Sequence, residues 1–219
     1  MQKIFHLTAK SLDLPEIFKN NLEQIRLLYP DWEVMVHTDE DIELFVREHF
    51  LEYCEHTFNK MPMKIMQVDT VRYMWMYIYG GVYCDFDIHF YRPIEFPCQP
   101  TFIHRDWTYP EDNAIKQSIH NCIFSSPKGH PLWLDFLEGI SKNVTTLSTT
   151  KWGKLLKKQP RVFDVTGPNA ISRIISDKKV SGKYNDIKIL PGKTLFQQGK
   201  STTPLDDASV EHQVAGSWR

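Results

Sequence analysis

Apolar and polar positions follow two alternating spacings along the first 50 residues. The run at 2–8 is rich in strand-forming residues, and from Ile17 to Leu28 the apolar positions lie three or four apart, as on one face of a helix. The same pair of patterns follows, with an alternating run at Trp32–His37 and a helical pattern that begins after Thr38. Strands and helices that alternate in this way predict an α/β fold, with a mostly parallel sheet covered by helices on both faces.

The next strong pattern is a wide apolar stripe from Lys64 to Tyr79, which predicts a largely buried helix. The Gly80–Gly81 pair ends it, because glycine readily adopts the backbone that terminates helices. A short apolar strand, Val82–Cys84, follows and carries Asp85 and Asp87 at its C-terminal end. Open α/β sheets bind ligands at that edge, so these two carboxylates are the first candidates for chemistry.

The remainder of the chain continues the same organisation. It predicts strands at Thr101–His104 and Asn121–Ser125, a helix that begins near His130, and a long loop over Gln198–Arg219. No repeat, low-complexity stretch or linker interrupts it. With 219 residues, 42% of them hydrophobic, the chain predicts a single domain over residues 1–219.

Charge argues against nucleic acid as a partner. The formal net charge is −1, which gives no overall attraction to nucleic acid or to an anionic membrane. The Lys151–Arg161 segment is locally basic and amphipathic, and it fits either a solvated helix packed by its apolar side or a peripheral contact with a membrane or lipid-linked acceptor. Residues 104–107, directly after a predicted strand, are candidates to line an acceptor site.

The expected location in the cell follows from what the chain lacks. No apolar segment approaches the ~20 residues that a membrane span requires, and the first apolar run, which begins after Lys3, is only a few residues long, shorter than that of a signal peptide. The four cysteines are scattered without a CxxC pair, which is typical of a reducing compartment. We therefore expect a cytoplasmic protein, peripheral at the inner membrane face if the basic segment contacts lipid.

Asp85 and Asp87 predict a metal site. Where a strand breaks into a loop, two carboxylates two positions apart can turn toward one cation. Without a cation, one carboxylate would raise the pKa of the other, and a divalent ion removes that conflict and bridges to phosphate oxygens. Oxygen ligands suit Mn²⁺ or Mg²⁺. Such a pair also arises by chance in surface loops, so its surroundings matter.

Asp69 and Arg72 lie three positions apart and share one face of the predicted buried helix. The guanidinium fork suits phosphate oxygens or sugar hydroxyls, so the two side chains can converge on one polar ligand. A structural ion pair on a buried helix is the other interpretation. The spacing alone leaves both open.

The string DTVRYMWMYIYGGVYCDFD at 69–87 resembles the DxxR and YGGxYxDxD signature of glycosyltransferase family 32, which includes yeast outer-chain mannosyltransferases and bacterial capsular polysaccharide transferases. The opening KIFHLTAK, the segment PDWEVMVHTDED, the stretch NCIFSSPKGHPLW, the TGP at 166–168 and the terminal HQVAGSW are similar to further motifs of that family. Together they cover nearly the whole chain in the family's order.

The resemblance implies a GT-A fold, a nucleotide-sugar donor and a metal-dependent, retaining transfer. It implies Asp85, Asp87 and His212 as ligands of Mn²⁺ or Mg²⁺, and Asp69, Asp87 and Asn121 as catalytic residues. His6 would line the nucleotide pocket, and the terminal loop would reach the diphosphate. The donor-binding residues implied in this way are His6, Asp69, Arg72, Tyr83, Asp85, Ser217 and Trp218.

Four positions depart from the family's motifs. Leu7, Ala9 and His37 stand where the family has glutamine, tryptophan and tryptophan, so uridine and guanosine donors both stay open. Gln213 stands where the terminal motif has its second histidine. Which of the two adjacent positions supplies a metal ligand therefore stays open as well.

The expected activity is that of an enzyme, a glycosyltransferase that moves a hexosyl group from a UDP- or GDP-sugar to a glycan or lipid-linked glycan in polysaccharide biosynthesis. As the bond to the diphosphate breaks, negative charge builds on the leaving oxygens, and a metal ion stabilises it. No carboxylate in a motif position stands out as a covalent nucleophile. This favours same-face displacement assisted by the leaving phosphate.

Two other classes compete with this interpretation. A haloacid-dehalogenase-like phosphatase also has a DxD at a strand end, but residues 88–90 lack the Thr or Val that usually follows it. A catalytically silent nucleotide-sugar-binding module would keep the fold and lose the metal ligands, whereas Asp85, Asp87 and His212 are all present. Turnover that needs metal and stops with a chelator separates the three classes.

Overall fold

The computed structural model describes residues 1–105, 118–149, 162–180, 182–197 and 205–214. Its strands are β1 (Ile4–Thr8), β2 (Glu33–His37), β3 (Gly81–Cys84), β4 (Ile88–Phe90), β5 (Thr101–His104), β6 (Ile119–Ser126), β7 (Lys188–Leu190), β8 (Leu195–Gln197) and β9 (Val210–His212). Its α-helices are α1 (Glu16–Leu28), α2 (Asp39–His49), α3 (Leu51–His56), α4 (Lys64–Ile78), α5 (Leu132–Thr149), α7 (Val162–Val165) and α8 (Pro168–Val180).

A central sheet organises the molecule. Its strand order is β2-β1-β3-β6-β5-β7. β1 pairs in parallel with β2 and β3, and β5 pairs in parallel with β7, whereas β6 runs antiparallel to both β3 and β5. The prediction of a mostly parallel α/β sheet is therefore confirmed, with β6 as the exception. β4, β9 and β8 form a second, smaller sheet.

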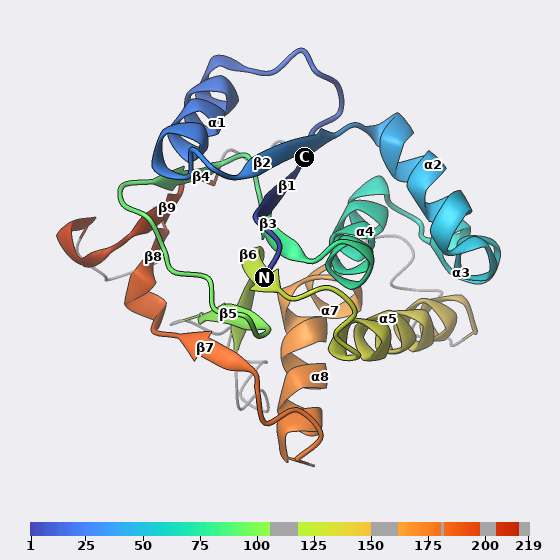
Figure 1. Cartoon of the computed structure of the whole chain (residues 1–219). Helices are drawn as coiled ribbons and strands as arrows, with labels where there is room; N and C mark the ends of the chain where they lie inside the picture. The colour runs from blue at the N-terminus through green and yellow to red at the C-terminus, as the bar shows by residue number, and fades with distance from the viewer. Residues whose placement is uncertain (106–117, 150–161, 181, 198–204, 215–219) are drawn as a thin grey trace.

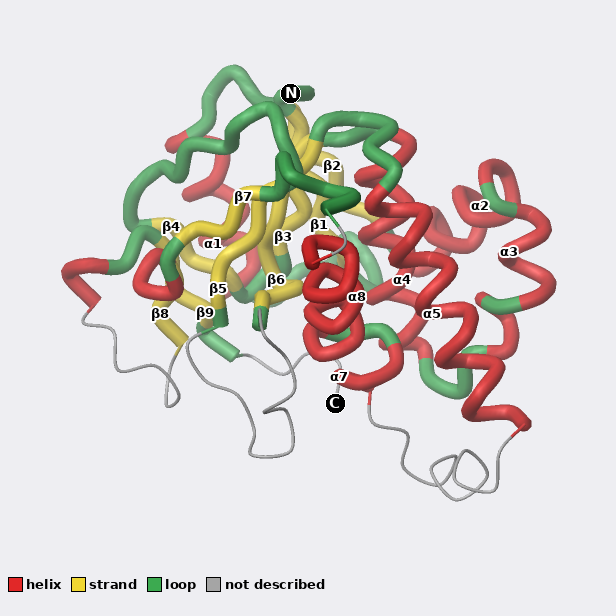
Figure 2. The backbone as a smooth tube through the Cα atoms, turned by 90° about the horizontal axis from the view of Figure 1, so that it is seen from below, coloured by secondary structure: helices red, strands yellow, loops and turns green. Residues whose placement is uncertain are grey.

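Helices cover both faces of the central sheet. α1 and the smaller sheet lie on one side of it, and α4, α5 and α8 lie on the other (Figures 1 and 2). Strand β3 serves both layers, because successive side chains of a strand point to opposite faces. Val82 and Cys84 belong to the apolar cluster that includes α1, and Tyr83 belongs to the cluster that includes α4 and α5.

Helix α4 is buried around much of its circumference, as its wide apolar stripe predicts; Tyr73, Met74 and Trp75 have no exposed surface. The turn after it requires glycine. Gly80 and Gly81 have φ values of 69° and 97°, in the left-handed region. A Cβ atom on Gly81 would lie 2.5 Å from the carbonyl oxygen of Ile4. This close passage sets β3 beside β1 and fixes where Asp85 and Asp87 leave the sheet.

The predicted loop over Gln198–Arg219 is wrong in part. Val210–His212 form β9, which lies between β4 and β8. A three-residue strand carries too short a pattern to be recognised, and its register depends on β4, whose paired residues lie between 120 and 124 positions earlier in the chain. The predicted helix at Lys151–Arg161 lies outside the described residues. Where the structure is described, no helix is both long enough and apolar enough to cross a membrane.

Candidate functional site

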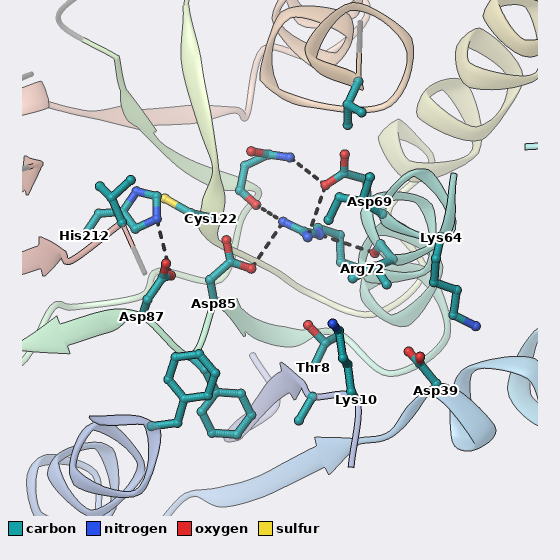
Figure 3. A pocket seen from close by; sticks show the side chains of 18 of the residues that line it. Thr8, Lys10, Asp39, Lys64, Asp69, Arg72, Asp85, Asp87, Cys122 and His212 are labelled. Atoms are coloured by element: carbon teal, nitrogen blue, oxygen red, sulfur yellow. Dashed lines mark hydrogen bonds and ion pairs between the residues drawn. The ribbon is translucent and has the colours of Figure 1, made fainter. Parts of the chain in front are cut away.

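A cavity of about 750 Å³ opens at the C-terminal ends of β1 and β3 (Figure 3). Residues of the loop that follows β1 line one side of it, and residues of the first half of α4 line another. Asp85, Phe86 and Asp87, from the loop after β3, border it together with residues 120–122 of β6. This is the sheet edge that the sequence pattern predicts for ligand binding.

Asp85, Asp87 and His212 meet at this cavity because β4 and β9 pair. The antiparallel ladder sets Ile88 opposite His212, and the backbone N–H of Gln213 donates to the carbonyl oxygen of Asp87 at 2.9 Å. One potential ligand atom from each of the three residues lies within 4.8 Å of the other two. His212 Nε2 lies 3.3 Å from Asp87 Oδ1.

This donor set fits a divalent cation. Two carboxylates and one imidazole border the same cavity, and hard divalent ions such as Mn²⁺ accept mainly oxygen with some nitrogen ligation. Gln213 takes another direction, since its Oε1 accepts a hydrogen bond from Asn21 at 3.0 Å. Of the two adjacent positions, His212 is therefore the one beside Asp87.

Two side chains, Tyr83 and Arg72, hold the Asp85 carboxylate in place. The Tyr83 hydroxyl donates to Asp85 Oδ1, and Arg72 NH1 lies 3.4 Å from the same oxygen. Burial raises the pKa of Asp85, the Arg72 guanidinium lowers it, and the neighbouring Asp87 raises it again. A cation between the two carboxylates would remove this repulsion.

Arg72 is buried and fully engaged by its surroundings. NH2 lies 3.1 Å from Asp69 Oδ1, NH1 donates to the carbonyl oxygen of Asn121 at 2.7 Å, and Nε donates to that of Val68 at 3.4 Å. The guanidinium also lies over the Tyr83 ring, 4.4 Å from its centroid. Arg72 thus lies between the carboxylates of Asp69 and Asp85. Its ion pair with Asp69 is structural, and Arg72 also lines the cavity.

Both carboxylate oxygens of Asp69 accept hydrogen bonds from the protein. Oδ1 accepts from Asn121 Nδ2 at 3.1 Å, and Oδ2 accepts from Thr166 Oγ1 at 2.9 Å. Burial raises the pKa of Asp69 to about 6, against the lowering effects of Arg72 and Thr166. Thr166 is the first residue of the TGP tripeptide at 166–168. Its hydroxyl fixes the carboxylate from the side opposite Arg72.

Thr166→Val is expected to destabilise the protein by about 1–3 kcal/mol, because it leaves a buried carboxylate oxygen without its donor while keeping the side chain's shape. Thr166 has no exposed surface, so water cannot replace the lost bond. Urea denaturation measures the effect. Thr166→Ser keeps the hydroxyl and serves as the control, and a Thr166→Val variant as stable as the wild type would show that the hydrogen bond contributes little.

Two residues predicted to bind the nucleotide sugar, His6 and Tyr83, are buried behind the residues that line the cavity. His6 is fully buried between His37, 3.0 Å from its Nδ1, and the Gly80 carbonyl oxygen, 3.0 Å from its Nε2. Tyr83 is fully buried as well and supports Asp85. Neither is among the cavity-lining residues, whereas Asp69, Arg72, Asp85 and Asn121 are. Ser217 and Trp218 lie outside the described residues.

Strand β6 adds one residue, His120, that no sequence motif marked. His120 lines the cavity beside Asn121; burial, and then His212 and Arg105, lower its pKa to about 3, so it is neutral. Arg105, from the 104–107 segment considered for an acceptor, also lines the cavity. Its guanidinium donates to Ser118 Oγ at 2.7 Å and to Asn169 Oδ1 at 2.6 Å.

Comparison with known proteins places this site in context. Residues 15–110 match the family described as "Glycosyltransferase sugar-binding region containing DXD motif". The chain is 27% identical over 219 residues to inositol phosphoceramide mannosyltransferase 1 of Schizosaccharomyces pombe, covering 99% of this chain and 61% of the relative. It is 30% identical over 139 residues to mannosyl phosphorylinositol ceramide synthase SUR1 of Saccharomyces cerevisiae, covering 63% of this chain and 34% of the relative. The chain thus spans less than two thirds of the length of these relatives.

Two solved structures share the fold. The PaToxG glycosyltransferase superimposes with a TM-score of 0.57 at 12% identity, covering 83% of this chain and 70% of that chain. The UDP-bound glycosyltransferase domain of the YGT toxin gives 0.54 at 10% identity, covering 86% and 79%. At these identities the likeness establishes the fold alone, which is GT-A as expected.

Proposed function

We propose that this chain, which belongs to the DXD-motif glycosyltransferases of the family 32 type, is a metal-dependent, retaining glycosyltransferase. Its donor would be a UDP- or GDP-sugar, and residues 1–219 would form its GT-A domain. One observation carries the proposal. The Asp85, Asp87 and His212 ligand atoms gather within 4.8 Å of one another, on the same cavity as the Asp69–Arg72 pair. A diphosphate held at the first group and a sugar held at the second would fill that cavity.

The relatives suggest the transferred sugar. Both relatives are named as enzymes that act with mannose, so a nucleotide-linked mannose is the first candidate donor. The base is left open by the same residues as before, Leu7, Ala9 and His37. Uridine and guanosine donors therefore enter the test together.

An apolar rim supports a lipid-linked acceptor. Phe163 and Val214 line the cavity, and Leu12 and Met63 adjoin residues that line it. Each of the four keeps 36–71% of its surface exposed. Exposed apolar groups beside a cavity that also contains charged side chains suit a substrate with a polar head and an apolar tail. The relatives' names, which include inositol phosphoceramide and phosphorylinositol ceramide, fit the same class.

The mechanism follows from how the residues are held. A divalent cation, when bound by Asp85, Asp87 and His212, supplies the positive charge that stabilises the leaving diphosphate. Arg72 contacts both Asp85, in the cation site, and Asp69, in the proposed sugar site. These contacts fix the distance between the two sites. Asp69 faces the sugar as a negative charge and favours the positive charge that develops there.

Asp69 is poorly suited to form a covalent bond to the sugar. Its Oδ1 accepts from Asn121 and Arg72, and its Oδ2 accepts from Thr166. A covalent bond to the sugar would weaken these buried hydrogen bonds, because an ester oxygen is a weaker acceptor than a carboxylate oxygen. This supports same-face displacement, in which the acceptor hydroxyl passes its proton to the leaving phosphate. Product with inverted anomeric configuration would contradict it.

The test is a screen of the purified chain against UDP- and GDP-sugars with Mn²⁺, repeated with EDTA. Release of one nucleotide is expected, and Asp87→Ala is expected to lower the rate by about 10³-fold, since metal stabilisation of the leaving group is worth several kcal/mol. Asp31→Ala, at an exposed position, is the matched control.

Other outcomes of the screen separate the alternatives. Hydrolysis of a generic phosphate ester without use of any nucleotide sugar would favour the phosphatase class. Binding of a nucleotide sugar without turnover, on any acceptor tried, would favour a catalytically silent binding module. Activity that survives both EDTA and Asp87→Ala would contradict metal dependence.

A further inference from the structure

Asn21 is a buried polar residue at the junction of three segments that are far apart in the chain. It lies on α1, which packs against β4 (Figure 1), and it is only 1% exposed. A polar side chain in the middle of a helix's apolar face costs free energy unless its hydrogen-bonding groups are satisfied. Its partners therefore indicate what it is for.

The amide group of Asn21 makes three hydrogen bonds in defined directions. Nδ2 donates to the carbonyl oxygen of Phe86 at 2.9 Å and to Gln213 Oε1 at 3.0 Å. Oδ1 lies 2.9 Å from His89 Nδ1 and accepts its proton. Because Nδ2 faces two acceptors and Oδ1 faces a ring nitrogen, only one orientation of the amide satisfies all three.

These partners flank the carboxylate and imidazole groups of the cation site. Phe86 is the residue between Asp85 and Asp87, and Gln213 directly follows His212. Gln213 also donates its backbone N–H to the Asp87 carbonyl oxygen at 2.9 Å. Asn21 thus ties the loop after β3 to the end of β9, the two segments that must stay together for the three ligands to converge.

We propose that Asn21 is a positioning residue for the cation site. Through its hydrogen bonds to Phe86 and Gln213, Asn21 holds Asp85, Asp87 and His212 close enough together to bind one cation. The inference rests on the proposed function. It also gives Gln213, which stands where the family has a histidine, a role other than ligation. A purely structural role, docking α1 on the sheet, is the competing account, since Phe18 and Leu22 of the same helix are buried beside it.

Mn²⁺ binding to the full chain, followed by the electron paramagnetic resonance signal of free Mn²⁺, tests the proposal without activity. Asn21→Leu, which is similar in size and removes all three bonds, is expected to raise the dissociation constant about tenfold, as loss of outer partners of metal ligands does. Gln213→Ala, at a partly exposed position, is expected to raise it severalfold. The double variant should add little to Asn21→Leu, because the two changes remove one shared bond. Asn20→Leu makes the same substitution at an exposed position of α1 and should leave binding unchanged.

The outcomes separate the possibilities. Wild-type affinity in both Asn21→Leu and Gln213→Ala, with a lowered melting temperature in the former, would overturn the proposal and leave Asn21 with helix docking only. If Asn21→Leu fails to fold by circular dichroism, Gln213→Ala decides alone, and unchanged Mn²⁺ affinity there overturns the proposal. Absence of Mn²⁺ binding in the wild-type chain would instead contradict the metal dependence on which the proposal rests.

Discussion

Arg72→Met is expected to destabilise the protein by about 3–5 kcal/mol, the cost of removing one partner from a buried ion pair. Arg72 is 3% exposed, and its guanidinium lies beside both Asp69 and Asp85. Methionine fills most of the space but leaves the buried Asp69 and the partly buried Asp85 without their guanidinium partner. Urea denaturation of the two proteins at pH 7.5 measures the difference in the free energy of unfolding.

The double variant Arg72→Met with Asp69→Asn separates charge from packing. It removes one of the two uncompensated charges, so we expect at least half of the lost stability to return. Nucleotide-sugar turnover should not return with it, because the proposed sugar contact is lost. Arg26→Met, at an exposed position of α1, is the matched control. A loss below about 1 kcal/mol in Arg72→Met would mean that this pair contributes no more than a surface pair.

Much of the fold could be predicted from local patterns. The alternation of strands and helices, the buried helix α4 and the glycines after it depend on spacing within about 20 residues. The direction of β6 could not be predicted, because an eight-residue apolar strand carries no record of which neighbours it joins. The strand β9 was missed for the same reason, since its pairing with β4 is set by distant partners.

The candidate site, like the fold, was predicted where local motifs mark its residues and was not predicted where contacts between distant residues decide. Asp85, Asp87 and His212 were predicted together from motifs, and the structure brings them together. Asn21 was missed and Thr166 was noted only as part of a motif, because the role of each depends on the atom it donates to, and those atoms lie 65 and 97 residues away in the chain. A polar residue on the apolar face of a helix was the one local signal for Asn21.

His6 and Tyr83 show how a motif can identify a residue while leaving its contacts open. Each alternates with apolar neighbours on a strand, so each points to the face opposite Phe5 or Val82. That face is covered by α4, whose Trp75 stacks on His6 with ring centroids 5.9 Å apart. The helix, and not the cavity, therefore receives these two side chains.

Acidification from pH 7.5 to pH 5 is expected to lower the free energy of unfolding by about 2 kcal/mol for each of His6 and His37. Burial, and then His37, lowers the pKa of His6 to about 3, and burial lowers that of His37 to about 4. The folded protein keeps both rings neutral at pH 5, whereas the unfolded chain protonates them below about 6.5. Stability is therefore complete above that pH and falls as the pH drops toward the folded values.

The geometry explains why the pair resists protonation. The Gly80 carbonyl oxygen can only accept, so His6 Nε2 carries the proton and Nδ1 must accept from His37 Nε2, 3.0 Å away. A second proton on His6 would face that donor, and His37 is only 8% exposed, so a charge on its ring would be poorly solvated. His37→Gln keeps a donor toward His6 and removes one titrating group. Its loss of stability between pH 7.5 and 5, measured by urea denaturation, should be smaller than the wild type's by about 2 kcal/mol. His56→Gln, at an exposed position, should lose as much as the wild type. An unchanged acid response in His37→Gln would show that other groups destabilise the protein at low pH.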